Sequence, residues 1–315
     1  MRVAGCLFTF TALVLGMSCL SVQAAPAEWY YHYLPGDYDG NGYDDICTFY
    51  PDTGTWSIWY NNNGSFGLAQ TINFGYSSCR AVPSDYDGDG KTDLALYDPA
   101  NGKWMVRRSR DSKTITVQWG WSEVVPVPAD YNGDGKTDIA VYYPNDGTWN
   151  ICFSSGSSKV LRMGYPGAIP VQGDYNGDGR DDVAVYMPST GAWQAIDALS
   201  ARSVMNLNWG WSSAMPVPAD YSGNGRIDPA VYANGTWYLN FNNGVTRTYQ
   251  WGGGNVLPVP GYYRSYKSYR HAQIGVFFPD SGTWALKECL IDWIAPWSIQ
   301  TSFGWAKKLP PPFKN

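Results

Sequence analysis

The loop Asp85–Asp93, which reads Asp-Tyr-Asp-Gly-Asp-Gly-Lys-Thr-Asp, carries the residues whose types and spacing are best suited to chemistry. Counted from its first residue, oxygen-bearing side chains stand at places 1, 3, 5 and 9, and glycines stand at places 4 and 6. Because glycine readily adopts left-handed backbone conformations, such a loop can turn tightly and direct alternate carboxylates into one small sphere. Oxygen ligands of this kind, completed by a backbone carbonyl at place 7, suit a hard cation such as Ca²⁺.

Four further copies of the loop keep the same places, with Asn or Ser replacing Asp at some of them. They are Asp37–Asp45, Asp130–Asp138, Asp174–Asp182 and Asp220–Asp228. A polar Asp-Gly hairpin turn is an alternative for any single copy, but five copies in one register favour metal binding. An EF-hand loop would continue to a Glu at place 12 between two helices, whereas here place 9 leads directly into a β-branched and aromatic strand.

The elements that hold these loops form a repeat of roughly 45 residues, a period typical of propeller blades. The third unit shows four short strands, which we predict at 138–143, 148–153, 159–163 and around 169–172. A sixth unit begins near Tyr262 without an acidic loop. The sequence therefore predicts an all-β propeller of six four-stranded blades, with seven blades as the alternative.

Three further positions recur in every unit. A large ring follows two residues after a glycine and is predicted to pack between neighbouring sheets: Trp56, Trp104, Trp149, Trp193, Trp237 and Trp284. A small residue follows the start of the first strand, which we therefore expect nearest the axis: Cys47, Ala95, Ala140, Ala184, Ala230 and Gly275. A bulky residue followed by Gly closes the unit, and the Pro-containing strand after it fits an edge rather than a central position.

Aromatic residues also recur directly after the closing glycine. They are Tyr76, Trp121, Tyr165, Trp211 and Trp305. They could serve as platforms for sugar rings, or they could pack between the blades.

Residues 1–24 have the features of a secretory signal peptide: one charge at Arg2, an apolar run and small residues before Ala25. The remaining residues, 25–315, are predicted to form a single domain that is secreted or held at the cell surface, or exported to a periplasm, with no membrane span. Closure of the ring should join 28–34 to the C-terminal blade near 303–312. A net charge of −5, concentrated in the Asp loops, argues against nucleic acid as a partner.

Taken together, the closing Phe-Gly or Trp-Gly, the Asp-x-Asp/Asn-Gly-Asp/Asn-Gly-x-x-Asp loop and the strand ending in Tyr-x-Pro resemble the FG-GAP or VCBS-type repeat over roughly residues 29–313. This repeat builds the propeller of integrin α-chains and of many secreted bacterial proteins. The resemblance implies a β-propeller with Ca²⁺ in its loops and a role in adhesion, or in binding a glycan or a surface or extracellular protein.

The resemblance also implies the ligands by their places in the loops. The side-chain ligands would be Asp37, Asp39, Asn41, Asp45, Asp85, Asp87, Asp89, Asp93, Asp130, Asn132, Asp134, Asp138, Asp174, Asn176, Asp178 and Asp182. The place-7 carbonyls would come from Tyr43, Lys91, Lys136 and Arg180. The fifth loop departs from the pattern and is expected to bind weakly, through Asp220, Ser222, Asn224 and Asp228. The second loop has the most carboxylates and is expected to bind Ca²⁺ most tightly.

Few residues suggest catalysis. The chain has two histidines, His32 and His271, and neither stands in a nucleophile or metal-binding motif. The sequence therefore favours a binding module over an enzyme. A carbohydrate-active enzyme, for instance a polysaccharide lyase that uses Ca²⁺ and a basic residue, stays open as an alternative, as does a structural scaffold without a small ligand. The four cysteines after residue 24 leave disulfide pairing open.

The sixth unit replaces the Asp loop by a longer segment, 261–271, that is rich in tyrosine and positive charge. Its aromatic rings and cations form a candidate surface for an anionic glycan or an acidic protein: Tyr262, Tyr263, Arg264, Tyr266, Lys267, Tyr269 and Arg270. The alternative is that this blade lost its metal site and the insertion only covers the gap.

Overall fold

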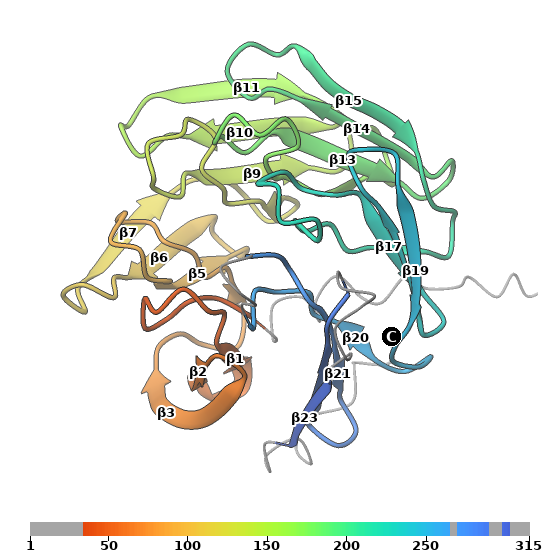
Figure 1. The fold of residues 1–315 in the computed structure, drawn as a ribbon. Coiled ribbons are helices and arrows are strands. Elements are labelled where there is room, and N and C mark those ends of the chain that lie inside the picture. Colours follow the sequence, from red (N-terminus) through yellow and green to blue (C-terminus); the bar gives the residue numbers. More distant parts are fainter. Residues whose placement is uncertain (1–33, 265–269, 290–297, 303–315) are drawn as a thin grey trace, which may run out of the picture.

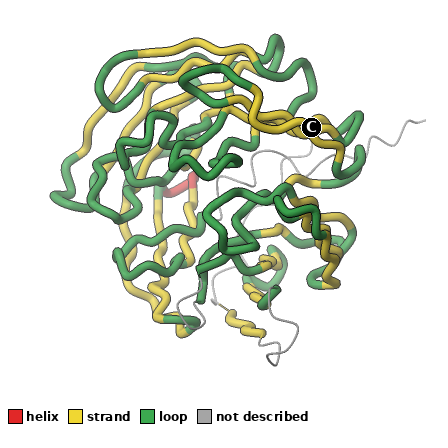
Figure 2. Tube along the Cα trace, turned by 45° about the horizontal axis from the view of Figure 1, so that its top comes forward, coloured by secondary structure: helices red, strands yellow, loops and turns green. Residues whose placement is uncertain are grey.

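The computed structural model describes residues 34–264, 270–289 and 298–302. Six antiparallel sheets surround a central axis as the blades of a propeller (Figure 1). The predicted six-bladed all-β propeller is therefore confirmed. Figure 2 shows strands joined by loops, with one short 3-10 helix, η2 (Pro51–Thr53), as the helical element of the described residues. The predicted signal peptide lies outside the described residues.

Each blade runs from a short inner strand to a largely exposed outer strand. The inner strands are β4 (Arg80–Ala81), β8 (Val125–Pro126), β12 (Ile169–Pro170), β16 (Met215–Pro216) and β20 (Leu257–Pro258). The second strands are β1 (Ile46–Tyr50), β5 (Leu94–Asp98), β9 (Ile139–Tyr143), β13 (Val183–Met187), β17 (Ala230–Ala233) and β21 (Ile274–Phe278). The third strands are β2 (Thr55–Asn62), β6 (Lys103–Arg107), β10 (Thr148–Cys152), β14 (Ala192–Ile196), β18 (Thr236–Asn240) and β22 (Thr283–Lys287). The outer strands are β3 (Ser65–Asn73), β7 (Thr114–Gln118), β11 (Ser158–Arg162), β15 (Ser203–Asn208), β19 (Thr246–Gln250) and β23 (Ser298–Ser302).

The strand boundaries in the third unit fall within one or two residues of those predicted, but two details of the prediction were wrong. The strand β12 pairs with β13 and thus belongs to the fourth blade rather than the third. The strands with the small residue are second in their sheets, because the Pro-containing strands take the inner edge. Proline lacks an N–H to donate to a neighbouring strand, so an edge position costs it no ladder hydrogen bond.

The recurring tryptophans pack between blades, as predicted. Trp149 on β10 is fully buried and shares a core cluster with Val183 and Val185 of the next blade. Its Nε1–H donates to the Met163 carbonyl (3.0 Å), so burial leaves the indole nitrogen satisfied. All six tryptophans of this position are at most 1% exposed.

The first and sixth blades pack against each other and close the ring. Ile46 and Trp59 of the first blade form one buried cluster with Trp284 and Leu286 of the sixth. Three strands of the first blade are described, and Leu34 N–H donates to the Cys47 carbonyl (2.9 Å) just as the residue after each inner strand does in other blades. The predicted closure through 28–33 and 303–312 lies outside the described residues.

The described residues also include the four cysteines, and they can be searched for a membrane-spanning helix. Cys47, Cys79, Cys152 and Cys289 are all free thiols, and Cys47 is completely buried, as expected for a small apolar residue. Within the described part of the chain, no helix has the length and apolarity needed to cross a bilayer.

Candidate metal centres

The aspartate at place 1 organises each loop. In the second loop, Asp85 Oδ1 accepts the N–H groups of Gly88 (2.7 Å) and Asp89 (3.2 Å), and its Oδ2 accepts that of Gly90 (2.8 Å). The same three bonds recur around Asp37, Asp130, Asp174 and Asp220. Gly88 and Gly90 have φ of 75° and 85°, a region that other residues rarely adopt, so glycine is required here.

The aspartate at place 9 is buried and ties each loop to its own blade. Asp93 accepts the N–H of Tyr86 within the loop (3.0 Å) and that of Ser109 in the turn after β6 (2.6 Å). Burial raises the pKa of the equivalent Asp45 and Asp182 to about 7. A buried carboxylate among other carboxylates is unfavourable when charged, so a bound cation would stabilise the charged form.

In the second loop, the Asp87 carboxylate gives the strongest indication of a cation site. Both carboxylate oxygens of Asp87 are buried without a hydrogen-bond partner. Its side chain is 8% exposed, and the nearest cation is the Arg110 guanidinium, with Nη2 at 3.3 Å from Oδ1. Burial, followed by the Asp89 charge, raises the pKa of Asp87. An oxygen-seeking cation would supply the partner that these oxygens lack, so the residues fit Ca²⁺.

Carboxylate oxygens gather closely in the first two loops. Those of Asp37, Asp39 and Asp45 lie within 4.8 Å of one another, as do those of Asp85, Asp87 and Asp89. The third and fourth loops keep the same backbone and hold Asn132 and Asn176 at place 3, with each amide oxygen accepting the place-5 N–H at 2.8 Å. The structure thus brings together three predicted carboxylate ligands in each of the first two loops, and the ligand sets of the third and fourth loops stay a prediction. Coordination by the place-7 carbonyls stays a prediction.

In the fifth and sixth units, neutral side chains replace aspartates at some places of the loop. In the fifth, Ser222 Oγ donates to Asp220 (3.3 Å), and two carboxylates are left at the ligand places. In the sixth, Gln273 stands at place 9; its Oε1 accepts the Arg264 N–H (2.9 Å) and its Nε2 donates to the Arg264 carbonyl (2.9 Å). A single amide thus satisfies both backbone groups, and this loop needs no ion to neutralise it.

Neighbouring loops are joined by one recurring hydrogen bond. The N–H at place 8 donates to the place-1 carbonyl of the preceding loop, for example from Thr92 to Asp37 (2.8 Å) and from Thr137 to Asp85 (2.8 Å). The sixth such bond, from Asp44 to Tyr262 (2.9 Å), closes the ring. The stem of Lys91 lies over Gly40, where an added Cβ would be 3.1 Å from it. An ion in one loop would therefore support its neighbours.

The tyrosine at place 2 has a structural role that was not recognised from the sequence. It is buried in all six units, and its hydroxyl donates to the carbonyl four residues earlier, as Tyr131 does to Val127 (2.7 Å). The signal was visible, since each Asp loop reads Asp-Tyr at its start. These tyrosines fix the loops to the inner strands.

Comparison with protein families matches these repeats. An FG-GAP-like repeat family matches residues 37–96 and 85–141, and an FG-GAP repeat family matches residues 125–160. Residues 37–160 are therefore FG-GAP repeats. No curated protein sequence matches it significantly.

Solved structures share the fold of this FG-GAP protein at low sequence identity. An Agrocybe aegerita lectin, described as recognising non-reducing terminal N-acetylglucosamine, has a TM-score of 0.56 and 18% identity, covering 81% of this chain and 76% of the lectin. Virginiamycin B lyase from Staphylococcus aureus has a TM-score of 0.52 and 8% identity, covering 84% of this chain and 83% of the lyase. At these identities the likeness concerns the fold alone.

A second surface of the FG-GAP propeller lies opposite the Asp loops. Among the described residues, the large aromatic side chains that are exposed are Tyr76 (43%), Trp121 (41%), Tyr165 (52%) and Trp211 (39%). All four follow a closing glycine. Trp121 lies 5.6 Å from the ring of Tyr143, which ends β9, whereas the Asp loop precedes the start of that strand. The exposed rings are therefore on the other face.

The tyrosine-rich segment of the sixth unit is only partly the surface that the sequence suggested. Tyr263 was wrongly included, because it is fully buried and its hydroxyl donates to the Val259 carbonyl (2.9 Å), the place-2 role. Tyr262 is half-buried beneath the exposed Arg270, whose guanidinium carbon is 4.9 Å from the ring centre. Arg264 is partly buried, and Tyr266, Lys267 and Tyr269 lie outside the described residues.

Proposed function

We propose that this FG-GAP propeller is an exported, Ca²⁺-binding module that binds glycans. The observation that carries the proposal is the recurrence of exposed aromatic rings at one place in four successive blades, on the face opposite the Asp loops. A single exposed aromatic residue needs no explanation, but a repeated one on a common face indicates an interaction surface.

The chemistry of these positions suits sugars. A pyranose presents apolar C–H groups on one face and hydroxyls at its edge, so it can stack on an indole or phenol ring while polar groups bind its edge. Such polar groups are close by: the Tyr76 hydroxyl donates to Asp98 (2.7 Å), and the Tyr165 hydroxyl lies 3.5 Å from the Gln194 amide. The lectin of similar fold supports this choice of ligand, and a surface protein is the competing partner.

In this proposal Ca²⁺ has a structural role. The ions would be held by the first four loops, most strongly where carboxylates cluster, and would neutralise charges that otherwise repel. We propose a binding rather than a catalytic role, since the carboxylates at places 1 and 9 of the Asp loops accept backbone N–H groups and His271 is buried against Glu288 (2.5 Å). Export would depend on residues 1–24 acting as a signal peptide.

A glycan array tests the proposal. Wild-type protein, in Ca²⁺ and in EDTA, would be compared with Trp121→Ala and Trp211→Ala. Val160→Ala is the matched control, because Val160 is an exposed apolar residue (61%) on the outer strand β11. We expect the tryptophan variants to stay folded, with a modestly lowered melting temperature, and to lose glycan binding, while the control retains it. A wild-type protein that binds no glycan, or tryptophan variants that bind normally, would contradict the proposal, and retention of a protein ligand alone would favour the competing partner.

A further inference from the structure

The contacts between successive blades follow one rule on the aromatic face. The side chain after the closing glycine reaches a residue of the next blade and fills the cleft between them. The Tyr165 hydroxyl lies 3.5 Å from Gln194 Oε1 on β14, and the Trp211 ring lies 4.9 Å from that of Tyr238 on β18. We call each such contact zone between successive blades a seam. In these seams the protein's own side chains fill the space.

The seam between the fifth and sixth blades breaks this rule on both sides. Gly253 stands at the place of Trp211, as the backbone confirms: its carbonyl accepts a tyrosine hydroxyl from Tyr232 (2.7 Å), just as the Trp211 carbonyl does from Tyr186 (2.8 Å). Ala285, on β22, stands at the place that Tyr238 takes on β18. Both members of the contacting pair are thus truncated, and space opens between the blades.

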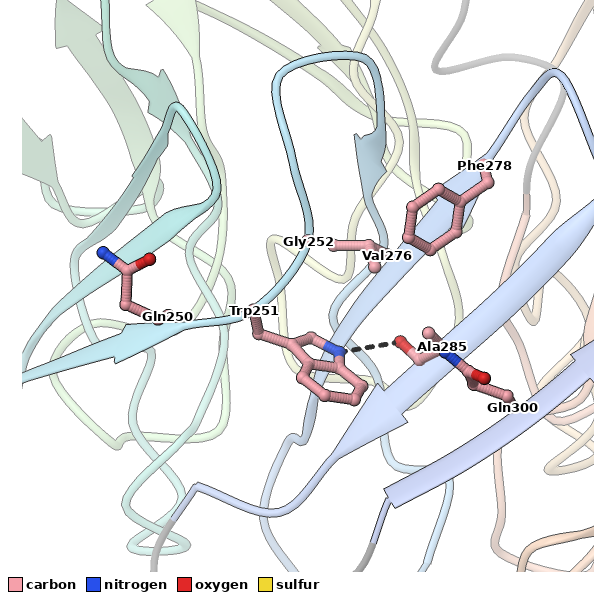
Figure 3. Close-up of a pocket in the computed structure, with 7 residues that line it drawn as sticks. All are labelled: Gln250, Trp251, Gly252, Val276, Phe278, Ala285 and Gln300. Atoms are coloured by element: carbon pink, nitrogen blue, oxygen red, sulfur yellow. Dashed lines mark hydrogen bonds between the residues drawn. The ribbon is translucent and has the colours of Figure 1, made fainter.

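A pocket of about 300 Å³ occupies this seam (Figure 3). Trp251, Val276 and Phe278 form its apolar walls, Ala285 lines the space opened by its small side chain, and Gln300 stands at one edge. The amide of Gln250 points away from the pocket and donates to Thr236 Oγ1 (3.0 Å). The site is preformed, since Trp251 Nε1–H donates to the Ala285 carbonyl (3.0 Å), which fixes the indole. Lys287 Nζ lies 5.3 Å from the centre of the same ring.

The lining limits the ligand to a small neutral one. The volume is at the lower end of the range for ligand pockets, so it admits one ring rather than an extended chain. The lining residues carry no charge, and the Lys287 ammonium beside the Trp251 ring disfavours a cationic ligand. Aromatic walls with an amide at the edge match a ring that is apolar on its face and bears hydroxyls around its edge.

We propose that the pocket between the fifth and sixth blades binds a single neutral pyranose residue at the end of a glycan. The ring would stack against Trp251 and Phe278, and its hydroxyls would meet the amide of Gln300. This inference rests on the proposed glycan-binding function and adds a defined subsite to it. It also sets this seam apart from the four self-filled ones.

The equivalence of Gly253 and Trp211 provides a direct test of the pocket. No atom lies within 4 Å of a Cβ added at Gly253, and its φ is outside the left-handed region, so Gly253→Trp should fold and place an indole in the pocket as Trp211 does one seam earlier. Gly254→Trp is the matched control, because Gly254 is equally open but does not stand at the place of Trp211. Ala285→Tyr, which copies Tyr238, is a second way to fill the site.

Binding would be measured by saturation-transfer NMR with a panel of neutral methyl pyranosides. We expect wild type and Gly254→Trp to bind at least one of them, and Gly253→Trp and Ala285→Tyr to lose it, with unchanged melting temperatures for Gly253→Trp. Undiminished pyranoside binding by Gly253→Trp would overturn the proposal, as would wild-type binding of N-acetyltryptophanamide but of no sugar. If Trp211→Ala abolishes glycan-array binding while Gly253→Trp leaves it intact, the proposed function stands and this subsite falls.

Discussion

Replacing Asp87 by Asn should have opposite effects on the metal-free and metal-bound protein. Both oxygens of this carboxylate are buried without a hydrogen-bond partner, beside Asp85 and Asp89. The substitution keeps the shape of the side chain and removes its charge. The third and fourth loops carry Asn132 and Asn176 at this place, so the fold accepts an amide there.

The size of the effect follows from the surroundings of Asp87. A buried polar group without a partner costs roughly 1–3 kcal/mol, and the half-exposed Arg110 nearby offsets part of this. We therefore expect Asp87→Asn to stabilise the metal-free protein by about 1 kcal/mol, or roughly 2 °C in melting temperature. With Ca²⁺, losing one charged ligand should weaken the second loop by roughly tenfold, or about 1.4 kcal/mol.

The assay combines thermal melts in EDTA and in Ca²⁺ with calorimetric titration. Asp39→Asn is the matched control, since Asp39 is at the same place in the first loop. Its carboxylate already accepts the Asn41 N–H (3.0 Å) and the Asn41 amide (3.1 Å), so its loss should not stabilise the metal-free form. If Asp87→Asn destabilises the metal-free protein, or leaves Ca²⁺ affinity unchanged, the reasoning about Asp87 is wrong.

Three further predictions concern the ion, the core and pH. Arg110→Ser should raise the Ca²⁺ affinity of the second loop in a calorimetric titration, because the guanidinium near Asp87 competes with the ion; unchanged or lower affinity would contradict this. Trp149→Ala should cost about 3–5 kcal/mol in chemical denaturation, because the fully buried ring fills the space between two blades, and a cost below about 1 kcal/mol would be inconsistent with this packing. Burial raises the pKa of Asp45 and Asp182 to about 7, above the unfolded value of about 3.9. The folded metal-free protein therefore binds protons more readily than the unfolded chain, and its melting temperature in EDTA should rise as pH falls from 8 to 5.5; a flat or falling trend would refute this.

The sequence was sufficient to predict the propeller and the arrangement of its loops because each place in a blade has one physical role. Glycine at places 4 and 6 reflects positive φ, and tryptophan in the third strand reflects the space between sheets. A requirement of this kind is repeated in every blade, so comparing the copies reveals it. The clustering of carboxylates in the first two loops follows from the same spacing.

Features that depend on which strands pair, or on which side chains face each other, could not be predicted by comparing the repeats. A repeat of fixed period does not say whether the Pro-containing strand pairs backwards or forwards, and β12 pairs forwards with β13. Tyr263 looked like part of a surface because its unit lacks the acidic loop, yet it keeps the buried place-2 role. The pocket lies in the seam where Gly253 and Ala285 take the places that Trp211 and Tyr238 hold in the preceding seam, and finding it requires knowing that these places face each other.

Calorimetric titration of the metal-stripped protein with Ca²⁺, paired with melts in Ca²⁺ and EDTA, tests most directly whether the Asp loops are metal sites. We expect uptake of more than one Ca²⁺ per chain, tightest at the second loop and weak or absent at the fifth, and a higher melting temperature with the ion bound. Titration without heat, together with a melt that EDTA leaves unchanged, would contradict the assignment of these loops as calcium sites.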